Sequence, residues 1–166
     1  MSQLEVVQIP CLTDNYGYLV HDSESKFTAS IDSPALDPIE DALRQNDWAL
    51  THIFNTHHHY DHTGANLELK KRWKCKIIGS EKDSDRIPGL DEGVNDQEIF
   101  NFGNNEVKVF DVSGHTIGHI SFYFPGEEKL FCGDALFALG CGRIFEGTPA
   151  QMWESLQKLE KLPEDT

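Results

Sequence analysis

Ten consecutive residues, 55–64, constrain the fold and chemistry of this chain more than any other stretch. They read Asn-Thr-His-His-His-Tyr-Asp-His-Thr-Gly and hold four of the chain's eight histidines. Neutral imidazole and carboxylate groups together suit zinc, iron or manganese. Residues 49–54 are apolar and β-branched enough for a buried strand, whereas Gly64 and the apolar residues after it are typical of a helix start. The sequence therefore predicts a metal-binding loop between a strand and a helix.

The spacing within this loop favours two adjacent metals. His57 and His59 are two residues apart, so in an extended segment their side chains project to the same side. Asp61 and His62 follow where the chain must turn into the helix, and they can point at a neighbouring position. One alternative is a merely polar histidine run, which the interruption by Asp61 and the preceding strand disfavour. Another is a single structural metal, for which nearby cysteines would be expected.

Two more candidate ligands follow predicted strands in the same manner. His115 lies between two glycines in residues 113–119, directly after a predicted strand at 107–112. Asp134 follows a predicted strand that ends at Cys132. Either residue alone would more often be a hydrogen-bonding loop residue than a ligand. Because strand ends cluster along one edge in α/β architectures, we expect both side chains to converge on the histidine cluster.

The remaining pattern predicts short strands and three helices in a single domain. Strands are expected at 4–9, 16–20, 27–31, 49–54, 76–79, 98–102, 107–112, 120–124 and 129–132, and helices at 38–45, 65–73 and from 149 onward. Asp37 is the expected cap of the first helix. Thr148, Pro149 and Gln151 form the capping box of the last. Residues 81–95 are polar and are predicted to form an exposed loop.

The charge balance restricts the possible partners. Fourteen basic residues against 28 acidic ones give a net charge of −14, so we expect neither nucleic acid nor a membrane surface as a partner. The basic run at 70–76 is expected to be a solvated helix end rather than a binding patch. The chain has no apolar run of about 18 residues, and we expect no signal peptide at its start. Four cysteines without a CxxC pair favour reduced thiols and a cytoplasmic location, or a mitochondrial one if a transit peptide has been removed.

These motifs together resemble the metallo-β-lactamase superfamily, and within it the glyoxalase II family of hydroxyacylglutathione hydrolases. The superfamily resemblance is carried by His-x-His-x-Asp-His at 57–62, Gly114-His115 and Gly133-Asp134. The closer one is carried by Cys-Gly-Asp-Ala-Leu-Phe at 132–137, Gly-Cys-Gly-Arg-Ile-Phe-Glu-Gly-Thr at 140–148 and Asp14-Asn15-Tyr16. It covers nearly the whole chain.

The resemblance implies an α/β (α+β) fold of the metallo-β-lactamase type, a four-layer αββα sandwich. It also implies two divalent metal ions at one edge, with zinc expected and iron or manganese as alternatives. Matched motif by motif, the first metal would be held by His57, His59 and His115, the second by Asp61 and His62, and both by Asp134. His58 and His119 would pack around these ligands.

The implied activity is hydrolysis of S-acyl glutathione thioesters, S-D-lactoylglutathione to glutathione and D-lactate, by a metal-bound hydroxide, as in methylglyoxal detoxification. Asp61 and Asp134 would be the catalytic carboxylates, and Arg143 would contact the glutathione moiety. Phe145 stands where the family often has tyrosine, so it cannot donate that hydroxyl hydrogen bond. The alternatives are a persulfide dioxygenase or a phosphodiesterase of the same superfamily, or a metal-binding chain without activity.

The family pattern continues beyond the point that corresponds to Thr166, with one more histidine and a helical region that binds glutathione. We therefore expect residues 1–166 to form a metallo-β-lactamase-like domain with an incomplete second metal site and without the helical substrate-binding domain. The expected partner is a small-molecule glutathione thioester, bound by a monomer.

Overall fold

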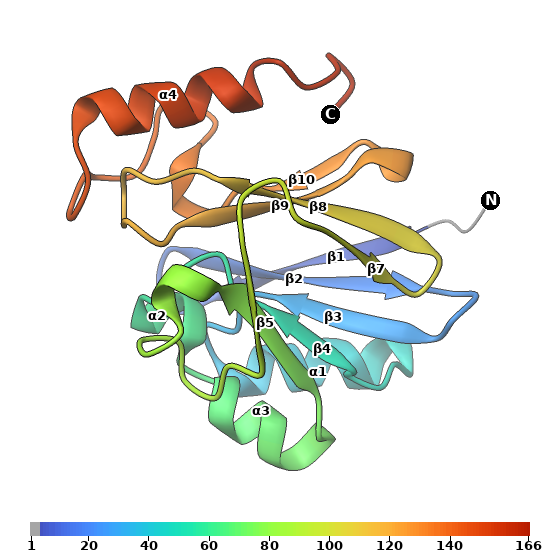
Figure 1. Ribbon diagram of the computed structural model, residues 1–166. Helices are drawn as coiled ribbons and strands as arrows, with labels where there is room; N and C mark the ends of the chain where they lie inside the picture. The colour runs from blue at the N-terminus through green and yellow to red at the C-terminus, as the bar shows by residue number, and fades with distance from the viewer. Residues whose placement is uncertain (1–3) are drawn as a thin grey trace.

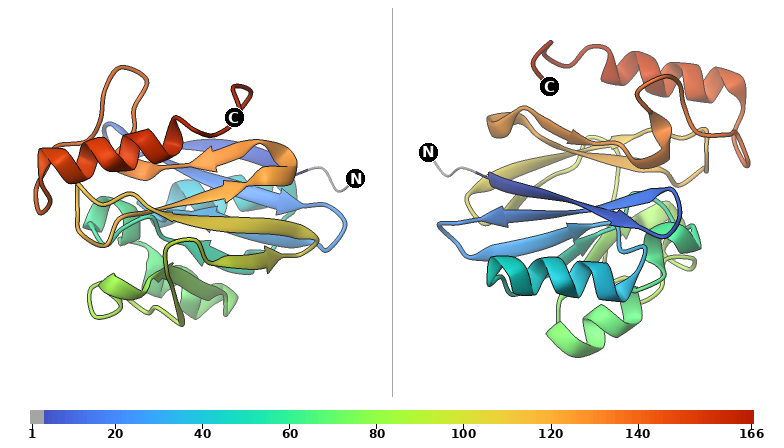
Figure 2. Two further views of the ribbon diagram at one scale, coloured as in Figure 1. Left: turned by 45° about the horizontal axis from the view of Figure 1, so that its top comes forward. Right: turned by 180° about the vertical axis from the view of Figure 1, so that it is seen from behind.

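The computed structural model describes residues 4–166 and places two β-sheets face to face, with helices on both outer sides (Figure 1, Figure 2). The larger sheet has the order β1 (Leu4–Cys11), β2 (Asn15–Asp22), β3 (Phe27–Ile31), β4 (His52–Phe54), β5 (Lys76–Ser80) and β6 (Glu92–Val94). The smaller sheet has the order β10 (Lys129–Phe131), β9 (Ile120–Phe124), β8 (Asn105–Asp111) and β7 (Ile99–Phe102). The predicted αββα sandwich is thereby confirmed.

Helices α1 (Leu36–Asn46) and α3 (Asn66–Trp73) cover the outer face of the larger sheet, and α4 (Pro149–Leu159) covers that of the smaller one (Figure 1). A fourth, one-turn helix, α2 (Tyr60–Thr63), and the 3-10 turns η1 (Glu81–Asp83), η2 (Pro125–Glu127) and η3 (Gly133–Ala135) lie in the loops. Within residues 4–166, none of the helices combines the length and apolar character needed to cross a membrane.

Strand direction in the larger sheet determines where the histidine loop emerges. Strands β1 to β3 are antiparallel, whereas β3 to β6 run parallel. Parallel neighbours need a crossover, which α1 supplies between β3 and β4, and α3 between β4 and β5. The carboxyl ends of β3 and β4 consequently share one edge, and Asp32 and the histidine loop begin there.

Alternating side chains on the strands fill three apolar layers. On β4, Ile53 packs among the residues beneath α1 and α3, and its neighbour Phe54 packs between the sheets. The layer between the sheets contains Val20, Ile31, Phe54, Ile78, Phe102, Val109, Phe122 and Phe124. A third layer under α4 contains Phe110, Val112, Tyr123, Ala135 and Leu159. Because β4 is buried on both faces, the loop that follows it starts from a rigid support.

Local signals located most elements, and the errors include one helix cap, one strand, the helix α2 and the start of β4, which is His52 rather than residue 49. The strands at 27–31 and 120–124 have the predicted bounds, and the Thr148–Gln151 capping box of α4 is present. Asp37 is not the cap of α1, because Ala35 holds the cap position. Asp37 lies in the first turn, where its negative charge interacts favourably with the helix dipole. The loop predicted at 81–95 contains β6, which pairs with β5 through backbone hydrogen bonds that its polar sequence does not indicate.

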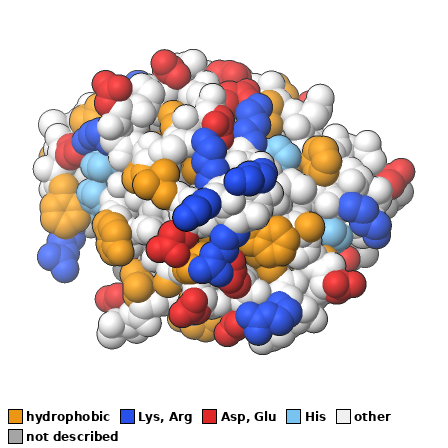
Figure 3. All heavy atoms as spheres, turned by 90° about the horizontal axis from the view of Figure 1, so that it is seen from below, with side chains coloured by type: hydrophobic (Ala, Val, Ile, Leu, Met, Phe, Trp, Pro, Cys, Tyr) orange, Lys and Arg blue, Asp and Glu red, His pale blue; other side chains and the backbone are white. Residues whose placement is uncertain are grey.

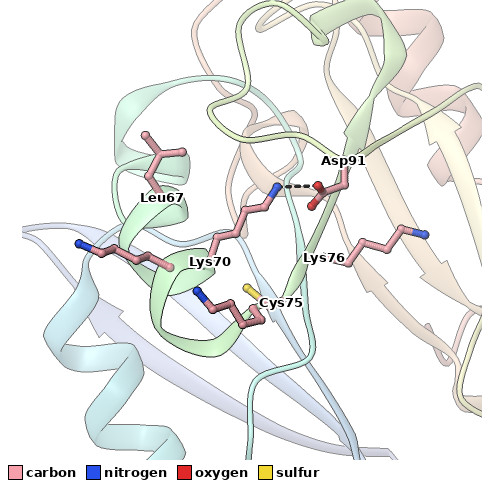
Figure 4. A pocket seen from close by; sticks show the side chains of 7 residues that line it. Leu67, Lys70, Cys75, Lys76 and Asp91 are labelled. Atoms are coloured by element: carbon pink, nitrogen blue, oxygen red, sulfur yellow. Dashed lines mark hydrogen bonds and ion pairs between the residues drawn. The ribbon is translucent and has the colours of Figure 1, made fainter.

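The basic run occupies the end of α3 and the start of β5, on the face that Figure 3 shows. Three of its side chains pair with acidic neighbours: Lys70 with Asp91, Arg72 with Glu40, and Lys76 with Glu92. In the shallow depression of Figure 4, the Lys70 ammonium points at Asp91, 2.5 Å away. These ion pairs agree with a solvated helix end.

The four cysteines all lie in the described residues and are free thiols that differ in burial. Burial raises the pKa of Cys11, and it raises that of Cys75 to about 11. At pH 8 we expect a disulfide reagent to label the exposed Cys141 in the native chain, and Cys11 and Cys75 only after unfolding. Peptide mass spectrometry locates the label, with the C141S variant as control. Fast native labelling of Cys75 would contradict the packing of β5 beneath α3.

Candidate metal centre

The candidate ligands lie on three loops at one end of the sandwich. The first loop leaves the larger sheet after β4, and the other two leave the smaller sheet after β8 and β10. The side chains converge as expected, although the strand ends that carry them belong to two sheets rather than to one. The ligands meet because the two sheets are stacked face to face, which brings strand ends from both sheets together.

His57, His59 and His115 form a first group of converging ring nitrogens. The Nδ1 atom of His59 lies 3.1 Å from Nε2 of His57 and 3.1 Å from Nε2 of His115. Burial and the neighbouring histidines lower the pKa values of His57 and His59. Neutral imidazole is the form that binds a metal, so the surroundings favour ligation.

His57, His62 and Asp134 form a second group. One carboxylate oxygen of Asp134 lies 3.2 Å from Nε2 of His62, and the other lies 3.4 Å from Nε2 of His115. Asp134 thus faces both groups at once. Asp61 lies at the outer edge, with a carboxylate oxygen 3.5 Å from Nε2 of His62 and a side chain that is 52% exposed. The structure therefore brings together all six predicted ligands.

The outer ring nitrogen of each buried histidine in these groups faces a hydrogen-bond acceptor. The pairs are His62 Nδ1 with Asp32 Oδ2 at 2.8 Å, His115 Nδ1 with Arg143 O at 2.6 Å, and His57 Nδ1 with Thr56 Oγ1 at 3.0 Å. A proton on each outer nitrogen leaves the lone pair of the inner nitrogen directed into the group, as in histidine–metal sites. The donor set therefore fits divalent metals that accept nitrogen and oxygen ligands.

Both groups open into a cleft of about 1220 Å³. Arg143 and Phe145, the two predicted substrate contacts, line its wall. The Phe145 ring is 62% exposed and stands edge-on to His59 and His115, with centroid distances of 5.7 and 5.2 Å. The candidate metal ligands, the Arg143 cation and the apolar Phe145 ring therefore face the same cleft.

A model of the metallo-beta-lactamase superfamily matches residues 24–166. The chain belongs to the metallo-β-lactamase superfamily. It is 50% identical over 163 residues to a curated protein of Methylococcus capsulatus named hydroxyacylglutathione hydrolase, an alignment that covers 98% of this chain and 64% of that protein. A protein of the same name from Rhizobium etli is 51% identical over 166 residues, which cover 100% of this chain and 65% of the relative.

The fold agrees with this membership. The crystal structure of the B3 metallo-β-lactamase BLEG-1 superposes with a TM-score of 0.86 at 23% identity, covering 96% of this chain and 88% of that one. The predicted resemblance to the metallo-β-lactamase superfamily is confirmed, and the chain spans about 64% of the length of the first curated relative.

Two histidines of this metallo-β-lactamase domain lie beside the groups without joining them, as expected. Nδ1 of His58 faces the buried carboxylate of Asp83 at 2.9 Å. Nε2 of His119 accepts a hydrogen bond from the Asp134 backbone N–H at 3.1 Å, and its ring stacks on His57. Burial lowers the pKa of His119 to about 3, so this ring stays neutral.

Sequence reasoning missed Asp32, which supports the histidine loop from beneath. Its buried carboxylate accepts hydrogen bonds from the Thr56 N–H and hydroxyl, each at 2.8 Å, and faces His62. Burial acts to lower the pKa of His62, but the charges of Asp32 and Asp134 outweigh it and raise the pKa to about 10. A metal at Nε2 would replace that proton. The position of Asp32 after a predicted strand was the only signal in the sequence.

Asn15, at the start of β2, was quoted only as part of a motif, and the structure gives it a contact in the site. Its side-chain N–H group donates to the Asp61 carbonyl at 2.7 Å and lies 3.2 Å from the Asp61 carboxylate. The side-chain oxygen of Asn15 accepts from the Tyr16 N–H at 2.7 Å. The β1–β2 hairpin therefore fixes the orientation of Asp61.

Proposed function

We propose that this chain is a metal-dependent thioester hydrolase that cleaves S-acyl glutathione thioesters, with S-D-lactoylglutathione as substrate. The observation that carries the proposal is the Asp134 carboxylate, which directs one oxygen to His62 and the other to His115 at the floor of a large cleft. The name hydroxyacylglutathione hydrolase of relatives at about half identity supports the choice of substrate.

Two divalent metal ions fit this arrangement, with zinc preferred and iron or manganese as alternatives. We assign the first to His57, His59 and His115, the second to Asp61 and His62, and Asp134 to both. Bound metals would polarise the thioester carbonyl and lower the pKa of a coordinated water. Because the first position has three imidazoles and Asp134, and the second has one imidazole, Asp61 and Asp134, we expect the first position to bind its metal more tightly.

The surrounding residues orient the reactants. Asp61, held by Asn15 and half exposed to the cleft, accepts a proton as water attacks the acyl carbon. The carbon–sulfur bond then breaks, the thiolate takes the proton from Asp61 and leaves as glutathione, and the acyl group is released as D-lactate. Phe145 shields one side of His59 and His115 with an apolar ring. Release of thiol from S-D-lactoylglutathione by the metal-loaded chain tests the proposal, and release no faster than in a chelated control would refute it.

The guanidinium of Arg143 provides a test of substrate recognition. We expect R143A to raise KM for S-D-lactoylglutathione by roughly tenfold and to change kcat by less than about threefold, because this contact to a substrate carboxylate exists equally in the ground and transition states. Steady-state kinetics measure both values, with R143K as the conservative control. An equal KM of the parent chain for uncharged thioesters would count against carboxylate recognition.

A further inference from the structure

A buried carboxylate outside the metal groups starts a chain of charged contacts. Asp83, at the end of η1, is fully buried. Its oxygens face Nδ1 of His58 at 2.9 Å and Nη2 of Arg86 at 2.5 Å. A Cβ atom at Gly118 would lie 2.1 Å from one of these oxygens, so the close packing requires glycine there. A buried charge needs such partners, because desolvation is otherwise costly.

Arg86 extends the chain of contacts to Glu146. Its guanidinium meets the Glu146 carboxylate with two nitrogens, Nη1 to Oε1 at 2.5 Å and Nη2 to Oε2 at 3.3 Å. Glu146 also accepts a hydrogen bond from the Ile117 N–H at 2.8 Å. Because two nitrogens contact two oxygens, the pair restricts the orientation of the Glu146 carboxylate as well as its distance from Arg86.

Glu146 belongs to the loop at 140–148 that carries Arg143 and Phe145. Backbone bonds tie this loop to the His115 loop: the Phe145 N–H donates to the His115 carbonyl at 3.1 Å, and the Gly147 N–H donates to the Gly114 carbonyl at 3.1 Å. The Arg143 carbonyl in turn accepts from Nδ1 of His115. Any displacement of Glu146 would therefore move the Arg143 side chain and the Phe145 ring relative to the metal groups.

From these contacts we propose that Arg86 and Glu146 are positioning residues that hold the 140–148 loop over the metal centre. They set the distance between the cation that binds substrate and the ligands that surround the reacting carbonyl. Asp83 and His58 anchor the guanidinium from beneath. The kinetic consequence rests on the proposed function, whereas the loss of loop order does not.

The first test uses the peptide bond after Arg143 as a reporter of loop order. Trypsin cleaves there only when the loop opens, so we expect E146A to release residues 144–166 roughly tenfold faster than the parent. E146Q, which keeps the acceptor for Ile117 but not the charge, should give an intermediate rate. Mass spectrometry follows the fragments. The control is R72A, which removes an arginine–glutamate pair far from the cleft and should leave the rate unchanged.

The second test separates KM from kcat. E146A should raise KM for S-D-lactoylglutathione roughly tenfold, with kcat within about threefold and metal content unchanged. R86K keeps a cation beside Asp83, so its KM should lie between those of the parent and E146A. Parent-like cleavage after Arg143 and parent-like KM in a folded E146A chain would overturn the proposal. A parent chain that hydrolyses no thioester would refute the function alone, because the trypsin comparison still tests the positioning role.

Discussion

The D134A variant is expected to lose most of its bound metal and more than about 100-fold in kcat/KM for S-D-lactoylglutathione. The carboxylate faces both His62 and His115, so its removal weakens both metal positions. Loss of a residue that merely orients a ligand typically costs 10–100-fold in metal affinity or activity, and a shared ligand should cost more. Competition with a chromophoric chelator measures the affinity, and thiol release measures the rate.

The matched control is H58A, which removes a histidine of the 57–62 motif that is not a predicted metal ligand. Its ring faces Asp83 rather than the two groups, so we expect metal affinity within about threefold of the parent. A larger loss of metal in H58A than in D134A would mean that the opposite face of the histidine loop binds the metal.

The D32A variant is expected to lower the free energy of unfolding by about 3–5 kcal/mol. It leaves the Thr56 N–H and the His62 ring without their acceptor, and both residues are buried. Urea unfolding with a chelator present measures this loss separately from any loss of metal. Without a chelator, metal at the second position should also weaken, because His62 is no longer oriented.

Two further variants serve as controls for the loss of stability in D32A. D32N keeps an acceptor for Thr56 but removes the charge beside His62, and it should cost about 1–3 kcal/mol. D41A removes an exposed partner of Arg44 on α1 and should cost less than about 1 kcal/mol. If D32A were as mild as D41A, the Asp32 carboxylate would not support the histidine loop.

The sequence predicted those helices and strands whose own side chains determine their secondary structure. The capping box at Thr148 and Gln151 depends on four consecutive residues, and β3 depends on a five-residue run that begins with Phe27 and contains the β-branched residues Thr28 and Ile31. The strand β6 depends instead on a neighbouring strand, since Glu92 and Gly93 have low strand propensity of their own. The helix α2 has one turn and consists of site residues, so its sequence shows no amphipathic period.

In the candidate site, too, some residues could be predicted from the sequence and others could not. The six candidate ligands were predicted because their spacing forms motifs, and the structure brings their side chains together. The residues that support them were missed, because their contacts join distant parts of the sequence: Asp32 meets His62 30 residues on, Asn15 meets Asp61 46 residues on, and Arg86 meets Glu146 60 residues on. No spacing rule connects such pairs. The order of β2, β3 and β4 in the larger sheet brings the first two pairs together, and the stacking of the two sheets brings Arg86 to Glu146.

Metal analysis combined with thiol release from S-D-lactoylglutathione tests whether the chain is a metal-dependent thioester hydrolase. The 166-residue chain is purified without chelator, analysed for zinc, iron and manganese, then stripped and reloaded. We expect at least one divalent metal per chain, loss of hydrolysis on stripping and its return in proportion to the metal restored. Hydrolysis that persists in the stripped chain, or a chain that takes up no metal, would contradict this function.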